Sequence, residues 1–283
     1  VSSKLELPQA GASVNGSGSV ALAPSLDVQG ELDTQGKDLA SVMSVLSGKE
    51  QASSPLAGAF HVKGMLTANK TSAAIRDMNV TLAGVDATGA VTVDNLPQDG
   101  VSAPMQIALN LKSDSPVNID SMLPPPSNAK KSGGFLPETL TLPAGMIVKA
   151  DVALASATFK GMTGQKVSVS LMQQHKGLKA AIKAGVNGGS FDVNADMMYA
   201  TATTSGDGKS TTLSDPTMKA NIVANLPPAA AQKFLAPFAK DDTAQANFAR
   251  FTSDGIAFAM DTTVTPSTAQ IEAGKLKMNG TSF

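Results

Sequence analysis

The sequence predicts a mainly β protein, an extended antiparallel sheet of loosely repeated units in which a strand is followed by a short helix and a meander of strands. Two observations carry this prediction. Apolar and polar residues alternate with a period of two over most of the chain, which is typical of strands with one buried face. Three segments that begin near residues 26, 105 and 218 also share one order of predicted elements.

The alternation is clearest in residues 146–197, which contain four predicted strands. These strands cover residues 146–155, 167–171, 178–183 and 191–197. Their connections are short and carry turn signals, Gly-Met-Thr-Gly at 161–164 and Asn-Gly-Gly at 187–189. Because short connections join antiparallel neighbours, the segment is expected to be a meander with one apolar and one more polar face.

Each repeated unit contains one predicted short helix. The first begins at Asp38, a suitable N-cap residue, carries apolar residues at helical spacing as far as Leu46 and stops at Gly48. The second covers residues 119–123 before a triple proline, and the third opens at Pro227-Pro228 and includes Phe234, Leu235 and Phe238. Strands are predicted again after each helix, and the unequal spacing of the units favours one extended sheet over a strict solenoid.

The domain organisation follows from one stretch rich in proline and glycine. It divides the chain into a first β-repeat region over 1–123, a flexible loop or linker over 124–136 and a second β-repeat region over 137–283. The whole of 124–143 has the composition of a mobile loop. A sheet could equally run across this break, and we favour one continuous sheet. Residues 11–19 and 205–210 are expected to be flexible turns or loops.

Composition excludes several classes of function. The formal net charge is −1 and no basic cluster is larger than Lys130-Lys131, so the positive surface that nucleic-acid binding requires is missing. The chain has no Cys, which excludes disulfides, Cys-ligated metals and a cysteine nucleophile. The absence of Cys is compatible with a bacterial envelope protein. No window approaches about 18 apolar residues, so we expect any membrane anchor or export signal to lie upstream of Val1.

The search for catalytic groups predicts no enzyme. His61 and His175 are far apart in the sequence, and a catalytic histidine needs a positioned partner, so exposed polar positions are expected for both. Gly208-Lys209-Ser210 resembles the end of a phosphate-binding loop, but the earlier glycine of that loop is replaced by Thr203 and no helix is expected to follow. A hairpin turn explains this tripeptide better. No catalytic residue and no cofactor are predicted.

The search for a metal site is also negative. Asp192, Asn194 and Asp196 have the spacing that opens a calcium loop, but that loop requires Gly and Glu where this chain has Met197 and Thr203. Period-two alternation already explains the three polar residues as the solvated face of a strand.

The informative feature is therefore the apolar face of the predicted sheet. One sheet with three short helices does not cover all the apolar side chains that the alternation places on one side. Three coverings remain open: the sheet curls over on itself, other parts of a longer chain pack on it, or a lipid chain lies on it. Thirteen Met against eleven aromatic residues suit a soft, adaptable apolar surface, although Met also fills ordinary cores.

Several segments resemble the repeated units of bacterial AsmA-like proteins. The first runs from Leu26 to Leu39, reading LDVQGELDTQGKDL, and is followed by MSVLSG at 43–48. AGAFHVKG at 57–64 and MNVTLAGVDATGAVTV at 78–93 show the same order of strand, glycine turn and strand, as do 176–179 and 188–193. The resemblance spans roughly residues 20–283 and rests on pattern and composition.

This resemblance implies an envelope protein of Gram-negative bacteria, related to bridge-like lipid-transfer proteins and concerned with outer-membrane lipid homeostasis or assembly. It implies a curved sheet whose concave apolar face carries phospholipid acyl chains. It also implies a periplasmic location, with the inner membrane reached through a segment upstream of this chain.

If a lipid covers the apolar face, its lining is expected in the predicted meander. The candidate lining residues are Val148, Val152, Val167, Val169, Leu178, Ile182, Phe191 and Val193. Each buried methylene of an acyl chain contributes about 0.8 kcal/mol, so such a groove needs no specific polar contact and its selectivity is expected to be low. The alternative is a structural or adhesion-type β protein of the cell surface with a closed, dry core.

Overall fold

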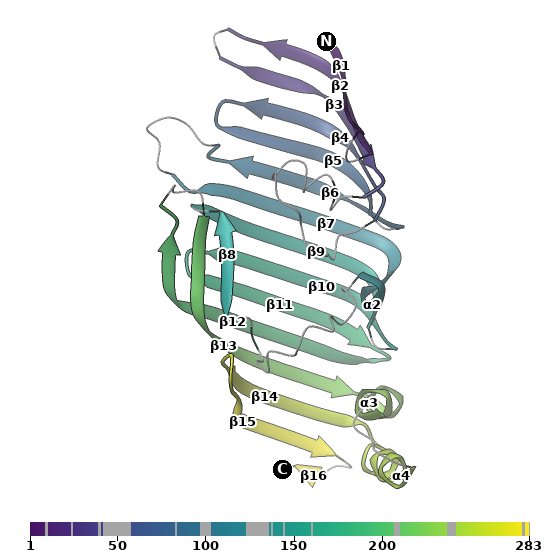
Figure 1. Cartoon of the computed structure of the whole chain (residues 1–283). Coiled ribbons are helices and arrows are strands. Elements are labelled where there is room, and N and C mark those ends of the chain that lie inside the picture. The colour runs from purple at the N-terminus through teal and green to yellow at the C-terminus, as the bar shows by residue number, and fades with distance from the viewer. Residues whose placement is uncertain are drawn as a thin grey trace. The chain divides into compact units, whose positions relative to one another are not determined.

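The computed structural model describes residues 1–8, 11–23, 25–38, 41, 58–82, 84–96, 103–122, 136, 138–143, 145–159, 161–206, 210–236, 242–278 and 281–282. Within these residues the chain is mainly β-structure in antiparallel pairs, with a few short helices (Figure 1). The predicted mainly β, antiparallel fold is confirmed. The chain forms two compact units, Val1–Ser127 with Ile147–Val152 and Asn128–Met146 with Ala153–Phe283, which we describe separately.

In the first unit, each strand pairs with the next one along the chain. The elements are β1 (Ser2–Leu7), β2 (Ala12–Ala21), β3 (Asp27–Gly36), β4 (Phe60–Asn69), β5 (Ser72–Leu82), β6 (Val85–Asp94), β7 (Met105–Asn118) and α2 (Ile119–Met122). Residues 147–152 of β9 (Met146–Phe159) also belong to this unit, and β9 follows β7 in the order of hydrogen-bonded strands.

The register of the first unit places apolar side chains and glycines on one face. Phe60 of β4 lies opposite Leu82 of β5, and the neighbouring partners Val62 and Val80 lie on the same face. Phe60 and Ala12 are buried, and Val62 and Leu82 pack against them. The opposite face carries polar partners such as Lys63 and Asn79. Strict alternation in the sequence therefore produces one apolar and one polar face here, as predicted.

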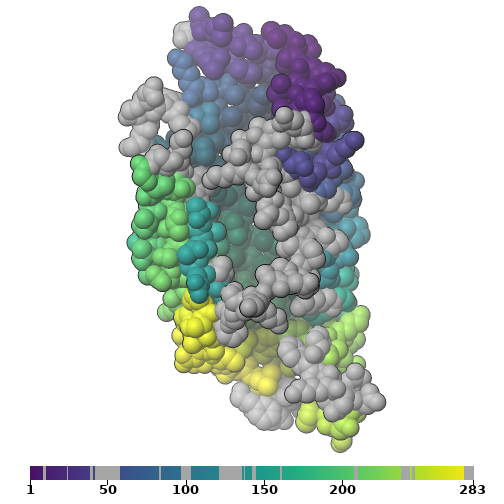
Figure 2. Space-filling view, viewed as in Figure 1, coloured from purple at the N-terminus to yellow at the C-terminus, as the bar shows by residue number. Residues whose placement is uncertain are grey.

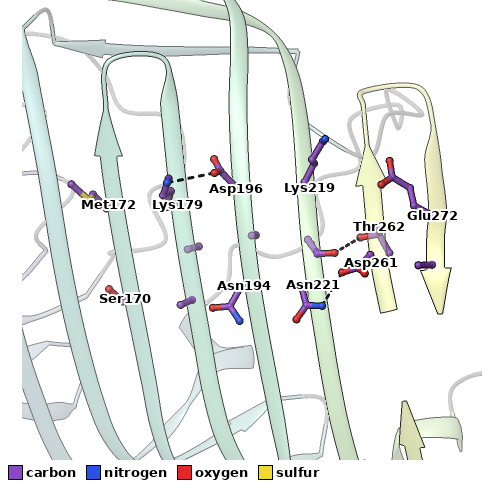
Figure 3. A pocket seen from close by; sticks show the side chains of 15 residues that line it. Ser170, Met172, Lys179, Asn194, Asp196, Lys219, Asn221, Asp261, Thr262 and Glu272 are labelled. Carbon is purple, nitrogen blue, oxygen red and sulfur yellow. Dashed lines mark hydrogen bonds and ion pairs between the residues drawn. The ribbon is translucent and has the colours of Figure 1, made fainter. Parts of the chain in front are cut away.

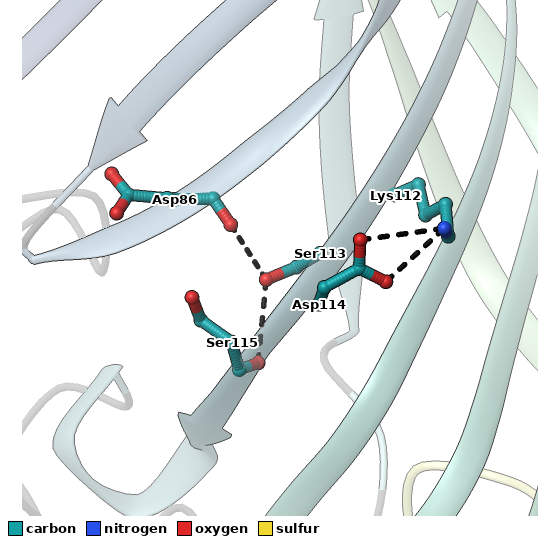
Figure 4. Close-up of polar contacts among 5 residues, drawn as sticks. All are labelled: Asp86, Lys112, Ser113, Asp114 and Ser115. Atoms are coloured by element: carbon teal, nitrogen blue, oxygen red, sulfur yellow. Dashed lines mark hydrogen bonds and ion pairs between the residues drawn. The ribbon is translucent and has the colours of Figure 1, made fainter.

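A buried serine fixes the start of β6 against β7. Ser113 is 2% exposed, and its hydroxyl contacts two backbone carbonyl oxygens, donating to Asp86 O at 2.6 Å and lying 3.3 Å from Ser115 O (Figure 4). The adjacent residues point to solvent, where Lys112 and Asp114 form an exposed ion pair of 3.1 Å. The backbone contacts satisfy the hydroxyl, which explains why this polar side chain is buried.

The second unit continues the same pattern with longer strands. It contains β8 (Thr139–Pro143), the rest of β9, β10 (Met162–Gln174), β11 (Gly177–Val186), β12 (Gly189–Thr204), β13 (Ser210–Leu226), α3 (Pro228–Leu235), α4 (Asp242–Phe251), β14 (Ile256–Val264), β15 (Ala269–Met278) and β16 (Thr281–Ser282). From β10 to β16 each strand pairs with its sequence neighbour. The predicted meander over 146–197 is thus β9 to β12.

Strand β13 has two different partners along one edge. Its second half, Met218–Leu226, pairs with β14, and its first half, Ser210–Ser214, pairs with β8. The end of β12, Thr201–Thr204, pairs with the same first half of β13. These three segments form a small sheet that we call the β8 wall, and Figure 1 draws β8 in front of β10 to β12. Asp215, with a φ of 57°, lies between the two halves of β13.

Two expectations about irregular segments were wrong, and two elements were missed. Residues 12–19, expected as turns or loops, belong to β2, because they pair along their whole length with β3. The last part of the predicted 124–143 loop, Thr139–Pro143, is strand β8. Helix α4 and strand β1 were not predicted at all. In β2, pairing with β3 outweighs a local composition rich in Ser and Gly, and in β8, pairing with β13 outweighs the proline-rich stretch that precedes it.

Two of the three predicted helices are present, as α2 and α3. Pro228 occupies the first turn of α3, as its fixed φ favours. The first predicted helix falls on residues 39–46, which lie outside the described residues except for Ser41, and so do Gly48 and Phe238. Ser41 N donates to Asp38 Oδ2 at 3.1 Å, which is the geometry expected of Asp38 as an N-cap. The proposed linker 124–136 also lies outside the described residues, apart from Leu136.

Candidate functional site

The candidate site is the apolar face of the second unit. Residues that pair directly across antiparallel strands lie on the same face of the sheet. Val169 of β10 pairs with Ile182 of β11, and Ile182 pairs with Val193 of β12. The row continues through Ile222 of β13 to Met260 of β14. Five neighbouring strands therefore contribute one large apolar side chain each to a single row.

Parallel rows extend this surface in both directions along the strands. They comprise Leu171, Ala180, Ala195 and Ala220; Leu178, Met197 and Met218; and Ala184, Phe191, Ala224 and Phe258. We call this whole surface the apolar face. Phe191 and Met197 are six residues apart in β12, so the rows cover about 20 Å along the strands.

Six of the eight candidate lining residues lie on this face. Val169, Leu178, Ile182, Phe191 and Val193 belong to the rows above. Val167 joins them because it follows a bulge at Lys166, whose φ is 51°, and lies with Ala184 beside Gly164. Because of this bulge, the Val167 side chain stays on the apolar face although the pairing register shifts between Gln165 and Ser168.

The other two candidates, Val148 and Val152, lie in the part of β9 that belongs to the first unit. They alternate there with Lys149 and Asp151, which form an ion pair of 3.2 Å and so share the opposite side of the strand. The structure therefore brings six of the eight predicted residues together within one unit.

One end of the apolar face is closed by helix α3. Ala230 and Ala231 of the helix are 1% and 0% exposed and pack with Val186, Leu226 and Ile256. Phe191 and Phe258 pack against this cluster, and the Phe234 ring of the helix lies 5.9 Å from the Phe258 ring. Alanines allow the helix backbone to approach the sheet closely. Helix α3 and its cluster therefore cover the apolar face at Phe191.

The middle of the apolar face is not closed in the same way. Ile182 is 38% exposed, and its row partners Val169, Val193 and Ile222 are only partly buried. Figure 2 shows a hollow beside β8, with a dark teal floor. A partly exposed row of branched aliphatic side chains is the kind of surface that apolar ligands cover.

The end of the apolar face at the β8 wall is buried and contains two polar side chains. Tyr199 follows Met197 on the same face of β12 and is 2% exposed, and its partner Pro216 is fully buried. Gln173 lies opposite Leu178 and is 7% exposed. Within the described part of the chain, neither the Tyr199 hydroxyl nor Gln173 Oε1 has a hydrogen-bond partner. Burial raises the pKa of the Tyr199 hydroxyl, which therefore keeps its proton.

Sequence reasoning missed both residues, although one signal was available. Tyr199 is the only tyrosine of the chain and continues the apolar alternation of Phe191, Val193 and Met197. An aromatic residue with a hydroxyl at the end of an apolar run indicates a site that is part apolar and part polar.

The opposite face of the second unit is polar and carries a shallow hollow of about 680 Å³ (Figure 3). Lys179 Nζ lies 3.6 Å from Asp196 Oδ2, and Asn221 Nδ2 donates to Asp261 Oδ1 at 2.8 Å. Lys219 lines the same hollow. Positive, negative and amide groups alternate here and largely satisfy one another, which is typical of a solvated sheet face.

The run that resembles a calcium loop lies on this polar face. Asp192 and Asp196 form ion pairs with Lys183 and Lys179, and Asn194 donates to Asp192 at 2.9 Å. The interpretation as a solvated face agrees with these contacts. Among the described residues there is no group of three or more His, Cys, Asp or Glu that could hold a metal ion.

The two histidines also occupy exposed polar positions. His61 Nε2 lies 3.0 Å from Asp33 Oδ1 on the polar face of the first unit, where both side chains are more than 40% exposed. His175 is in the turn between β10 and β11, with a φ of 49°. Gly208 and Lys209 lie outside the described residues. Ser205 N donates to Ser210 O at 2.8 Å, and Ser210 N donates to Ser205 Oγ at 3.0 Å, at the β12–β13 connection.

Comparisons with protein families, curated proteins and solved structures find no match to this chain. Among the described residues, no helix has the length and apolarity needed to span a membrane.

Proposed function

We propose that this chain is a non-enzymatic lipid-binding or lipid-transfer module of a Gram-negative cell envelope, whose apolar sheet face holds phospholipid acyl chains. The observation that carries the proposal is the row Val169, Ile182, Val193, Ile222 and Met260, which is apolar across five strands and partly exposed. Binding of this kind needs no catalytic group.

The energetics favour an acyl chain as the occupant. The apolar face extends for about 20 Å between the α3 cluster and the row of Met197. At about 0.8 kcal/mol per buried methylene, ten methylenes would contribute about 8 kcal/mol before the cost of association is subtracted. The resemblance to AsmA-like proteins supports the same function and a periplasmic location.

The experiment that tests the proposal is native mass spectrometry of the chain purified from a bacterial envelope without harsh detergent, followed by extraction of bound lipid. The wild-type chain is expected to carry stoichiometric phospholipid. Ile182→Asp places a carboxylate against the acyl chain and is expected to reduce occupancy about tenfold or more, since that factor needs only ~1.4 kcal/mol. Val169→Asp is expected to have the same effect.

The matched control is Ala181→Asp. It introduces the same charge one residue away on β11, but Ala181 lies on the polar face between Ser170 and Asn194. This variant is expected to retain lipid at the wild-type level, and circular dichroism checks that every variant is folded. A folded Ile182→Asp variant that still carries lipid contradicts the proposal. A lipid-free wild-type chain would instead favour a structural or adhesion-type β protein with a closed core.

A further inference from the structure

Two buried polar atoms at the β8 wall end of the apolar face need a partner. The Tyr199 hydroxyl and Gln173 Oε1 are both enclosed, and the described residues supply neither with a hydrogen bond. A buried polar group without a hydrogen bond is costly, so nearly all such groups in proteins are satisfied by protein, water or ligand. The two side chains therefore mark a place where a bound molecule would be stabilised.

The register places both side chains on the face that we propose to bind lipid. β12 pairs with β11 without a shift from Gly189 to Met198, so Tyr199 points to the same side as Met197 and Val193. Gln173 pairs with Leu178, which in turn pairs with Met197. From the spacings of strands and residues, the two Cα atoms are roughly 12 Å apart. One polar group of a few atoms is long enough to reach both side chains.

We propose that Tyr199 and Gln173 bind the neutral glycerol-ester part of a lipid, whose acyl chain extends along the apolar face toward α3. This inference rests on the proposed function. The phenol can donate to the ester carbonyl of any acylglycerol lipid, phospholipids included, and Gln173 Oε1 can accept from a free glycerol hydroxyl in lipids that carry one, such as monoacylglycerols. Both groups are neutral and enclosed, so an uncharged ester and hydroxyl fit better than a phosphate or carboxylate, which would lose its hydration.

We expect a ligand to reach the two polar groups through movement of neighbouring methionine side chains. Met197 and Met218 lie opposite each other in the row next to Tyr199 and are partly buried. Methionine is unbranched and flexible, and its rotamers can change to admit a ligand. The ester would then lie at the β8 wall and the end of the acyl chain near Phe191 and the α3 cluster.

The test uses displacement of the apolar fluorophore N-phenyl-1-naphthylamine from the whole chain by two probes. Monooleoylglycerol has the acyl chain and the glycerol ester, whereas 1-octadecene has a chain of similar length and no polar group. Tyr199→Phe removes only the hydroxyl, and Gln173→Met removes the amide at similar volume. Each variant is expected to lower the affinity for monooleoylglycerol about threefold to tenfold, which is the range for loss of one neutral hydrogen bond. Neither is expected to change displacement by 1-octadecene.

A purely structural role for the two residues gives a different result. Removing an unsatisfied hydroxyl from a buried position raises the urea midpoint of unfolding in any case. If Tyr199→Phe leaves the affinity for monooleoylglycerol unchanged, the inference is overturned, whether or not this midpoint rises. If neither probe displaces the fluorophore from the wild-type chain, or the fluorophore does not bind, the proposed function itself fails and the inference fails with it.

Discussion

At the residue scale, close approach between strands explains a glycine that composition alone assigns to a loop. Gly18 of β2 lies directly opposite Gly30 of β3, and a Cβ atom on Gly18 would collide with the Gln29 carbonyl oxygen. Gly16, two residues earlier on the same face, would place its Cβ 3.5 Å from the nearest atom, Ser3 Oγ. The two glycines therefore have different physical roles in one strand.

This difference predicts opposite effects of one substitution. Gly18→Ala is expected to lower the free energy of unfolding by about 1–3 kcal/mol, because the neighbouring backbone must move. Gly16→Ala is expected to leave it unchanged or raise it by up to about 1 kcal/mol, because alanine restricts the unfolded chain. Urea unfolding followed by far-ultraviolet circular dichroism measures both. Equal effects of the two substitutions would show that the close contact at Gly18 is absent.

Tyr199 allows a second test at the same scale, because it is the only tyrosine and the chain has no tryptophan. Burial raises the pKa of its hydroxyl above the ordinary value of 10.0. The tyrosinate absorbance of the folded chain is therefore expected to appear at higher pH than that of the chain in urea. A titration with the same midpoint in both states would mean that Tyr199 is exposed in solution.

The same shift predicts how stability depends on pH. The folded state holds the Tyr199 proton more tightly than the unfolded state, so the stabilising contribution is complete below pH 10 and is lost as the pH rises through the folded-state pKa. Tyr199→Phe lacks this proton, and its stability is expected to fall less steeply above pH 10 than that of the wild-type chain.

At the element scale, the β8 wall depends on a pairing between distant segments. Thr141 of β8 lies opposite Thr212 of β13, and their hydroxyl oxygens are 3.2 Å apart. Directly opposed residues of antiparallel strands have Cα atoms about 4.5–5.5 Å apart, within the range that a disulfide can bridge. The chain has no native Cys, so an introduced pair supplies the only two thiols of each molecule.

The double variant Thr141→Cys with Thr212→Cys is expected to form an intramolecular disulfide on mild oxidation, measured as loss of free thiols at low protein concentration. The control combines Thr141→Cys with Thr211→Cys. Thr211 pairs with Leu142, so it points to the other face of the wall, and this pair is expected to stay reduced. Equal oxidation of the two pairs would contradict the register of β8.

The elements that could be predicted from the sequence are those with strong local patterns. Alternation predicted β9 to β12 because each strand has a distinct apolar side, as Val167 to Leu171 show. Proline at the helix start predicted α3. Strand β8 was missed because Thr139–Pro143 is short and directly follows a stretch rich in proline and glycine, and its pairing with β13 makes it a strand. Helix α4 was missed although Ala244, Phe248 and Phe251 have the i, i+4, i+7 spacing of an apolar stripe.

At the scale of the whole molecule, each unit has one apolar and one polar face, and the two faces serve different purposes. The polar faces carry cross-strand polar contacts such as His61–Asp33 and the ion pair Lys183–Asp192. The apolar face of the second unit is covered by α3 at one end and enclosed near Tyr199 at the other. Its middle, around Ile182, is where a ligand would gain most from burial.

The sequence by itself determined the strands with strong alternation, such as β9 to β12, and the side of each that is apolar, because period-two alternation is a property of neighbouring residues. It also identified six lining candidates that share one face, among them Val169, Ile182 and Val193. Only the tertiary structure decided that Phe191 packs against the α3 cluster and that Tyr199 and Gln173 are buried at the β8 wall. Burial of these side chains depends on pairing between segments far apart in the chain, which no local pattern records.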